Sequence, residues 1–399
     1  MARPRNSSTS RRTETAQALS EGYGLSDQVL SEGHGFSRAV GLRNSKGALA
    51  PEGTPSQLGY RMPAEWEPHA ATWIAWPHNR SDWPRKFEPI PWLYADIVRH
   101  LAAVECVEIL VNGATAERAA RAVLRCSTAA PGCVRFHRLP TNRGWIRDYG
   151  PIFVKNAGGC GVVKWRFNGW AKYRDWKKDE RAAERMVGGL NLPACFPALG
   201  NRRLVLEGGS IDVNGRGALL TTRECLLSRV QQRNPGVSRR QLEQAFAEYL
   251  GAGHVIWLER GIAGDDTHGH IDDTARFVAP DAVVAAVETD RREANYAPLQ
   301  KNLKLLQKAT DQEGRPLRVV ELPMPAPVYF RGQRLPASYA NFYIANSIVL
   351  VPTFNDPNDR VALNTLAEVF PSRCIIPIYC RDLVLGLGTL HCITQQQPR

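Results

Sequence analysis

The sequence lacks the patterns that mark several large classes of protein. No stretch is long and apolar enough to span a membrane, so we predict no membrane association. No dinucleotide fingerprint or phosphate-binding loop stands at a strand-to-helix turn, and we expect no cofactor. A zinc finger, a basic zipper and an RNA-binding aromatic signature are also missing.

Cysteine is sparse, with nine residues in a chain of 399. That density is below that of a disulfide scaffold, and the odd count without a Cys-x-x-Cys pair favours a reducing compartment. Arg11 and Arg12 are not followed by the apolar segment of a twin-arginine signal, and acids such as Glu14 and Asp27 argue against an organellar transit peptide. We therefore predict a cytoplasmic protein.

The net charge of +12 makes nucleic acid a partner to consider. However, no uninterrupted run of Lys and Arg exceeds two residues, and the basic side chains are spread along the chain. Dispersed charge of this kind is typical of a solvated surface. We predict no nucleic-acid partner.

Composition divides the chain into two parts. Residues 1–57 are rich in Ser, Gly and Arg with little apolar periodicity, which predicts a disordered extension. From residue 58 to residue 399 short apolar runs alternate with amphipathic stretches, which predicts one catalytic domain of mixed α/β class. The expected strands are 71–76, 107–111, 134–139, 254–258, 318–322, 347–351 and 374–379. The expected helices are 91–103, 115–125, 238–250, 297–309 and 361–370.

The C-terminal end carries a candidate nucleophile. Cys392 follows Gly386 and Gly388, which allow a sharp bend and a close approach to a ligand. A thiol presented in this way acts as a nucleophile if a base and charged partners meet it in space. The alternative is a buried structural cysteine, which is the commoner fate of a free thiol. The spacing alone favours the structural cysteine.

Two carboxylates upstream are candidates for binding a cation. Asp148 comes after Trp145 and Arg147, so Trp145 is a candidate flat wall beside an acceptor, unless Arg147 and Asp148 form only a local ion pair. Glu207 directly follows an apolar run and precedes two glycines. A buried charge there requires a partner, while an exposed strand-end Glu is the equal alternative.

The densest ionisable cluster spans residues 265–273 and has three interpretations. His270 is a candidate general base with Asp272 on the same face of a strand, two positions later. His268, His270 and Asp272 are also a plausible set of metal ligands. A polar loop that caps the next strand would explain several of the acids. The residues themselves leave all three open.

Taken together, these segments resemble the agmatine deiminase and bacterial peptidylarginine deiminase family of guanidine-modifying enzymes. The resemblance covers nearly everything from about residue 58 to the C-terminus, and it implies a five-bladed α/β propeller, or pentein, built from ββαβ modules. The matching segments are 62–69, 142–151, 206–209, 269–272, 338–343, 351–357 and 388–396.

The resemblance also implies roles for individual residues and no metal. Cys392 matches the family nucleophile, and His270 matches its general acid and base. Asp148 and Asp272 match the carboxylates that hold the guanidinium, and Glu207 matches their acidic partner. We further expect substrate contacts from Trp145, Arg147 and Gly388.

The activity implied is hydrolysis of a small guanidino substrate, namely conversion of agmatine to N-carbamoylputrescine and ammonia through a covalent thiouronium on cysteine. Deimination of peptidyl- or free arginine to citrulline is the alternative within the same class, because residues 142–144 and 167–173 depart from the family pattern. A metal-dependent hydrolase and an inactive guanidine-binding relative are the alternatives of other classes. A homodimer is the one assembly considered, and the sequence does not decide the oligomeric state.

Overall fold

The computed structural model describes residues 53–127 and 133–399. The predicted extension over residues 1–57 lies outside this part except for its last residues, so its boundary remains a prediction. None of the described helices combines the length and the hydropathy needed to cross a bilayer.

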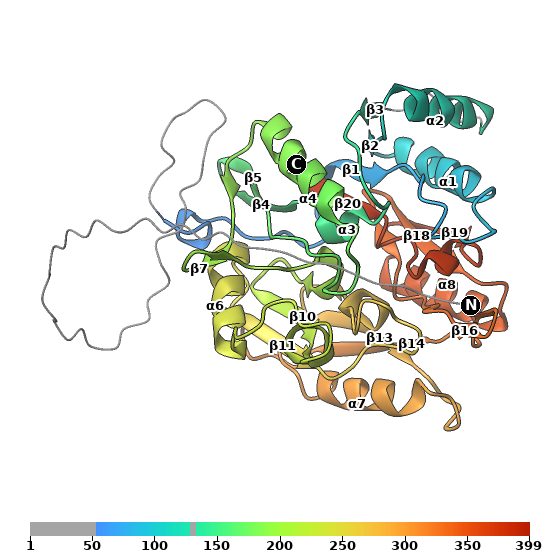
Figure 1. Cartoon of the computed structure of the whole chain (residues 1–399). Helices are drawn as coiled ribbons and strands as arrows, with labels where there is room; N and C mark the ends of the chain where they lie inside the picture. The colour runs from blue at the N-terminus through green and yellow to red at the C-terminus, as the bar shows by residue number, and fades with distance from the viewer. Residues whose placement is uncertain (1–52, 128–132) are drawn as a thin grey trace, which may run out of the picture. The chain divides into compact units, whose positions relative to one another are not determined.

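Five sheets repeat one ββαβ pattern, in which an antiparallel strand pair is followed by a helix and by a third strand parallel to the second (Figure 1). The first module is β20 (Thr394–Pro398), β1 (His69–Ala75), α1 (Ile90–Ala102) and β2 (Cys106–Leu110), with β3 (Val134–His137) added beside β2. The second module is β4 (Ile152–Asn156), β5 (Gly159–Val163), α4 (Lys177–Leu190) and β6 (Ala194–Cys195). The third module is β9 (Asp212–Val213), β10 (Ala218–Thr222), α5 (Arg223–Leu227), α6 (Arg239–Leu250) and β11 (His254–Leu258). The fourth module is β12 (Ala275–Ala279), β13 (Ala282–Val287), α7 (Tyr296–Leu306) and β14 (Arg318–Pro323). The fifth module is β17 (Tyr343–Ile344), β18 (Ile348–Thr353), α8 (Pro357–Val369) and β19 (Cys374–Tyr379).

These five modules confirm the predicted α/β pentein architecture. The first module takes its opening strand, β20, from the C-terminal end of the chain, where it pairs with β1. Helix α2 (Ala114–Cys126) and the two hairpins β7–β8 (Ala198–Leu199, Arg202–Arg203) and β15–β16 (Tyr329–Phe330, Gln333–Arg334) are additions to the repeat. Periodicity alone shows the alternation of elements but not this return of the chain end to the first sheet.

Apolar periodicity places the expected elements within a few residues of their observed bounds. In α1, Ile97 and Leu101 stand one turn apart and are fully buried, as a core-facing stripe requires. Helix α8 begins earlier than expected, at Pro357. Asp356 caps it in a reciprocal box with Asp359, and proline is well accommodated at the first helical position.

The segments that lead into the first strand of each module lie close to one another. Helix α3 (Ile146–Tyr149) precedes β4, the 3-10 turn η2 (Gly208–Ser210) precedes β9, and the turn η3 (Ile271–Asp273) precedes β12. η2 contacts both α3 and η3, and α3 also contacts β20. The turn η4 (Leu383–Gly386) lies on the path into β20. Equivalent positions of several modules therefore face one region.

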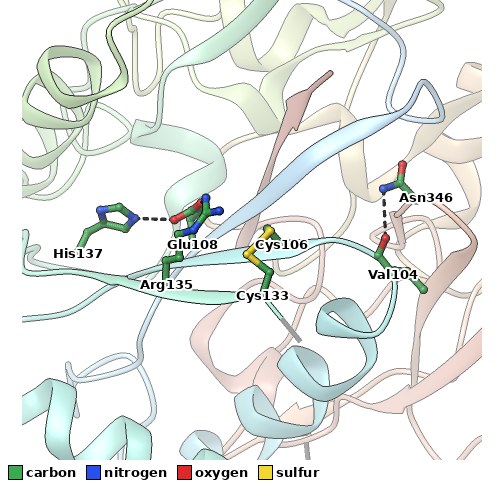
Figure 2. Close-up of a disulfide and its surroundings, with 7 residues drawn as sticks. All are labelled: Val104, Cys106, Glu108, Cys133, Arg135, His137 and Asn346. Atoms are coloured by element: carbon green, nitrogen blue, oxygen red, sulfur yellow. Dashed lines mark hydrogen bonds and ion pairs between the residues drawn. A yellow bond between two sulfur atoms is a disulfide. The ribbon is translucent and has the colours of Figure 1, made fainter. Parts of the chain in front are cut away.

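A disulfide links β2 to the residue before β3. This bond corrects the expectation of free thiols in a reducing compartment. Cys106 opens β2, and Cys133 directly precedes β3, the parallel neighbour of β2 (Figure 2). Strand pairing brings their Cα atoms to 4.5 Å although 27 positions separate them in sequence. The same strand pair carries Glu108, which accepts hydrogen bonds from Arg135 at 2.8 Å and contacts His137 Nε2 at 2.7 Å. The cysteine count could not reveal this proximity.

We expect the denatured protein, prepared without reductant, to show seven reactive thiols, because the other two cysteines are bonded to each other. Reduction should expose all nine cysteines of the sequence. Titration with a chromogenic disulfide measures both values. Cys133→Ser is the control and should free Cys106 for reaction. Nine reactive thiols before reduction would show that the disulfide does not form.

Candidate active site

Cys392 lines a cavity of about 310 Å³. Asp148 and Cys392 line it together with the indoles of Trp145 and Trp170. Gly388 packs against the thiol: a Cβ at this position would lie 3.1 Å from Cys392 Sγ. The glycine is thus required for the close approach of the turn to the nucleophile.

Asp148 is buried in the short helix α3, with its carboxylate oriented by two donors. Trp170 Nε1 donates to Oδ2 at 2.9 Å, and the backbone N–H of Gly209 donates to Oδ1 at 3.1 Å. Burial raises the pKa of Asp148 to about 6, since the opposing effect of His270 is weaker and neighbouring carboxylates add to the rise. No ion pair joins Asp148 to Arg147 among the described residues, so the local-pair interpretation is wrong.

Glu207 is fully buried, which removes the interpretation as an exposed strand-end residue. Arg233 Nε donates to both carboxylate oxygens, at 3.1 Å and 3.2 Å. Burial alone would raise the pKa of Glu207, but Arg233 and His270 outweigh it and hold the pKa below its usual value. Glu207 is therefore the buried charge with a partner that the sequence required.

His270 stands among the acids with both ring nitrogens buried and without a hydrogen-bond partner in the described part of the chain. Nδ1 lies 3.8 Å from Asp148 Oδ1, and Nε2 lies 3.8 Å from Glu207 Oε2. Burial alone would lower the pKa of His270, but Asp148 and the groups beside it raise it well above the ordinary value. The raised pKa favours the imidazolium, which can act as an acid.

Asp272 approaches the nucleophile from the turn η3, not from the strand expected for residues 270–272. Its Oδ2 accepts a hydrogen bond from His391 Nδ1 at 2.7 Å and lies 3.6 Å from Cys392 Sγ. Its Oδ1 is buried and unpartnered among the described residues. Burial alone would raise the pKa of Asp272, but the His391 hydrogen bond leads the effects that lower it.

Gly209 explains why two glycines follow Glu207. A Cβ on Gly209 would stand 2.6 Å from His270 Nδ1, 2.9 Å from Asp148 Oδ1 and 3.0 Å from Asp272 Oδ2. Any side chain at this position would displace all three groups. The glycine allows the acids and the imidazole to converge.

Cys392 is in an environment that favours the thiol over the thiolate. Burial raises its pKa well above the ordinary value, and Asp272, Asp273 and Asp148 raise it further. A buried thiol surrounded by carboxylates ionises readily only when a cation enters. The same carboxylates that oppose the thiolate would attract that cation.

Asn341, which the sequence did not single out, donates to the nucleophile. Its Nδ2 lies 3.2 Å from Cys392 Sγ. Thr389 Oγ1 and the backbone N–H of His391 donate to Asn341 Oδ1 at 2.8 Å and 3.1 Å, which orients the amide with its nitrogen nearer the sulfur. The protonated thiol can donate to the same Oδ1 at 3.6 Å, whereas a thiolate can only accept from Nδ2. The hydrogen bond from Asn341 lowers the pKa of Cys392, against burial and the neighbouring acids.

Arg147 requires a correction, because it does not line the cavity with Cys392. Its guanidinium donates to the His391 carbonyl at 3.2 Å, to Gln396 at 2.6 Å and to Glu65 at 3.2 Å. These contacts take up a guanidinium that is buried, with only 2% of Arg147 exposed. Arg147 therefore supports the segment that carries Cys392 and is not placed to meet a substrate in the cavity.

The histidine pair of residues 268–270 does not form a metal cluster. His268 Nε2 lies 3.1 Å from Ser228 Oγ. The ligand atoms of His268, His270 and Asp272, the set expected from the sequence, are not close enough together to share an ion. Within the described ranges the only three His, Cys, Asp or Glu ligand atoms close enough to share an ion belong to Glu207, Cys225 and His270. Arg233 already occupies both oxygens of Glu207, and its charge opposes a cation there.

We expect Asn341→Ala to make Cys392 harder to ionise, since the thiolate loses its only side-chain donor. The pH midpoint for alkylation of Cys392 by iodoacetamide should rise by about one to two units. Mass spectrometry of the Cys392 peptide separates this reaction from that of other thiols. Asn112→Ala, which removes an amide bonded to Thr141, is the control. An unchanged midpoint in Asn341→Ala would remove Asn341 from the reacting group.

Comparison with known proteins agrees with this geometry. The family model of Porphyromonas-type peptidyl-arginine deiminase matches residues 61–398. An agmatine deiminase of Stutzerimonas stutzeri is 38% identical over 371 residues, covering 86% of this chain and 97% of the relative. A solved agmatine deiminase of Enterococcus faecalis superposes with a TM-score of 0.80 at 32% identity, covering 87% of this chain and 98% of the other. Campylobacter jejuni agmatine deiminase with substrate bound gives 0.75 at 29%, covering 85% and 96%. The chain belongs to the Porphyromonas-type peptidyl-arginine deiminase family, which includes agmatine deiminases.

Proposed function

We propose that this protein hydrolyses agmatine to N-carbamoylputrescine and ammonia, with Cys392 as the nucleophile. The observation that carries the proposal is that the Cys392 thiol and the Asp148 carboxylate line one cavity with further groups directly beside them. The His270 imidazole lies 3.8 Å from both Asp148 and Glu207, and Asp272 lies 3.6 Å from the thiol. The names of its relatives support the substrate, since the S. stutzeri and E. faecalis proteins are agmatine deiminases.

Binding of the substrate follows from the unsatisfied atoms of the site. A guanidinium is planar and permanently charged, and its N–H groups match carboxylate oxygens in pairs. Asp272 Oδ1 is free for such a bond, and Asp148 lines the same cavity. Glu207 contributes negative charge on the other side of His270. The indoles of Trp145 and Trp170 provide flat walls for the cation and its aliphatic arm.

The bound cation then favours the thiolate of Cys392, because it offsets the carboxylates that raise the pKa of that thiol. Sγ attacks the guanidinium carbon and forms the C–S bond. Protonated His270 gives its proton to the departing nitrogen, the C–N bond breaks, and ammonia leaves behind a thiouronium on Cys392. Neutral His270 next takes a proton from water, which attacks the same carbon. The hydroxyl on that carbon then loses its proton, which the released ammonia takes up in solution as ammonium. Cleavage of C–S releases the ureido product and regenerates the thiolate.

The charges farther along the cavity favour agmatine over free arginine. Asp82, Asp266 and Arg143 also line it. Arg143 is the one cation in this lining, and it is paired with Asp82 and with Asp175, the latter at 3.2 Å. No unpaired cation among the described lining residues remains for an α-carboxylate. A second ammonium, as in agmatine, instead meets the carboxylates of Asp82 and Asp266, which it would share with Arg143 and Lys172.

We keep the cytoplasm as the proposed compartment and a homodimer as the assembly to examine. We propose no nucleic-acid partner, no cofactor and no metal. The reaction written above is balanced with water as the only co-reactant.

We expect ammonia release from agmatine by the wild type and none above background from Cys392→Ser, because serine is a far weaker nucleophile at neutral pH. An ammonia and ureido-product assay run in parallel with agmatine, arginine and an arginine-containing peptide measures both reaction and preference. Cys374→Ser, which changes an exposed cysteine, should retain full activity. Equal release by wild type and Cys392→Ser would refute the thiol mechanism, and a preference for arginine or peptide would overturn the choice of substrate.

The pH dependence of kcat/KM should show an acid limb near pH 6. Asp148, whose pKa is raised to about 6, binds the guanidinium as the carboxylate. Its protonation therefore removes binding as the pH falls through that value, while at higher pH it stays ionised. Steady-state rates at subsaturating agmatine between pH 4.5 and 8 give the profile, on the order of a tenfold loss per pH unit below the midpoint. A flat profile down to pH 5 would contradict this role.

A further inference from the structure

His391 bridges two carboxylates next to the nucleophile without lining the cavity itself. Nδ1 lies 2.7 Å from Asp272 Oδ2, and Nε2 lies 2.9 Å from Glu65 Oε2. All three side chains are buried, with His391 only 3% exposed. The two contacts fix the buried imidazole at both of its ring nitrogens.

The bond to Asp272 requires His391 to be the donor. Burial alone would raise the pKa of Asp272, but the hydrogen bond from His391 leads the effects that lower it. An ionised carboxylate can only accept, so the ring nitrogen that faces Asp272 carries a hydrogen. His391 therefore places a donor directly behind Asp272.

Glu65 is itself held firmly, which makes it an anchor for the ring. Arg276 NH2 forms an ion pair with Oε1 at 2.9 Å, and Arg147 NH2 donates to Oε2 at 3.2 Å. The backbone N–H of Ile344 donates to Oε1 at 2.8 Å. These donors come from β12, α3 and β17, three different modules. The position of His391 is thus set by the framework and not by the substrate.

We propose that His391 is a positioning residue for the substrate site, acting through Asp272. Its Nδ1–H holds Oδ2, which leaves the buried Oδ1 as the acceptor for the guanidinium. Without this bond Asp272 could rotate or take up a proton more readily, because Asp148 and Asp273 are like-charged neighbours. His270, whose Nδ1 lies 4.0 Å from Oδ1, and Arg276 would then be the cations left to favour the carboxylate. The inference deepens the proposed function, and it depends on that function only for the guanidinium as the ligand.

Two substitutions separate positioning from structural support. In His391→Asn the amide nitrogen can occupy the place of Nδ1 and still donate to Asp272, but it cannot reach Glu65. In His391→Gln the amide reaches the place of Nε2 near Glu65, but it leaves Asp272 without a donor. Each variant breaks one end of the bridge, so a purely structural role predicts similar effects from both.

The measurement is protection of Cys392 from iodoacetamide by methylguanidine, followed on the Cys392 peptide by mass spectrometry. We expect His391→Gln to weaken protection by about 10- to 100-fold and His391→Asn by only a few-fold. The pH below which protection fails should rise in His391→Gln, because Asp272 loses the bond that lowers its pKa. Thermal unfolding of each variant shows whether it is folded.

Equal weakening by the two variants, or no weakening by His391→Gln, would overturn the proposal. A single folded variant is enough for the test. If only His391→Asn folds, a loss of protection as large as that expected for His391→Gln contradicts positioning. If only His391→Gln folds, unchanged protection contradicts it. The proposed function is tested apart from this, because methylguanidine protection requires no turnover. A wild type that is protected but does not deiminate agmatine would refute the substrate and leave the role of His391 standing.

Discussion

The structure depends on holding three carboxylates and a thiol together out of water. Like charges in a low-dielectric interior repel strongly, and each one costs desolvation energy unless it is paired. Each acid here has its own partner: Arg233 for Glu207, His391 for Asp272, and the Trp170 and Gly209 N–H groups for Asp148. Of these acids Asp148 lines the cavity beside Cys392, and Asp272 keeps Oδ1 without a hydrogen-bond donor among the described residues. The negative charge of this pair is complementary to a guanidinium.

The repeated module produces this arrangement, because the site residues occupy equivalent positions in its copies. Asp148, Glu207, Asp272 and Cys392 all lie within a few residues before the first strand of a module, and Asn341 occupies the same place in the module that begins at β17. Five equivalent entry segments thus each contribute to the site. The acids are rigid because α3, η2 and η3 contact one another, which fits the need to preorganise charge before the substrate arrives.

Sequence reasoning could identify the titratable residues but not their supports. Residue type and neighbouring glycines mark Cys392, His270 and the three acids as candidates, but only the resemblance to the deiminase family assigned their roles. Sequence reasoning did not identify Asn341 and His391 as site residues, because a neutral amide and a histidine beside the nucleophile have no distinctive spacing. Their roles arise only from contacts between modules, such as the one that joins residues 119 positions apart. The position of Asn341 before a module's first strand is the one signal that the repeat could have provided.

The same limit explains the errors. Arg147 adjoins Asp148 in sequence, yet the helical turn of α3 directs its guanidinium to Glu65 and Gln396. Cys106 and Cys133 look unrelated until β2 and β3 pair. Helix and strand periodicity reports local geometry well, and it carries no information about which distant segments meet.

The most direct test of the central claim is to trap the covalent intermediate. Acid quenching during turnover of agmatine, followed by mass spectrometry of the peptide that contains Cys392, measures whether carbon becomes bonded to sulfur. The account predicts an increase equal to the mass of agmatine less ammonia, confined to Cys392 and absent without substrate. Steady turnover with an unmodified Cys392 peptide at every quench time, or an adduct on another residue, would contradict it.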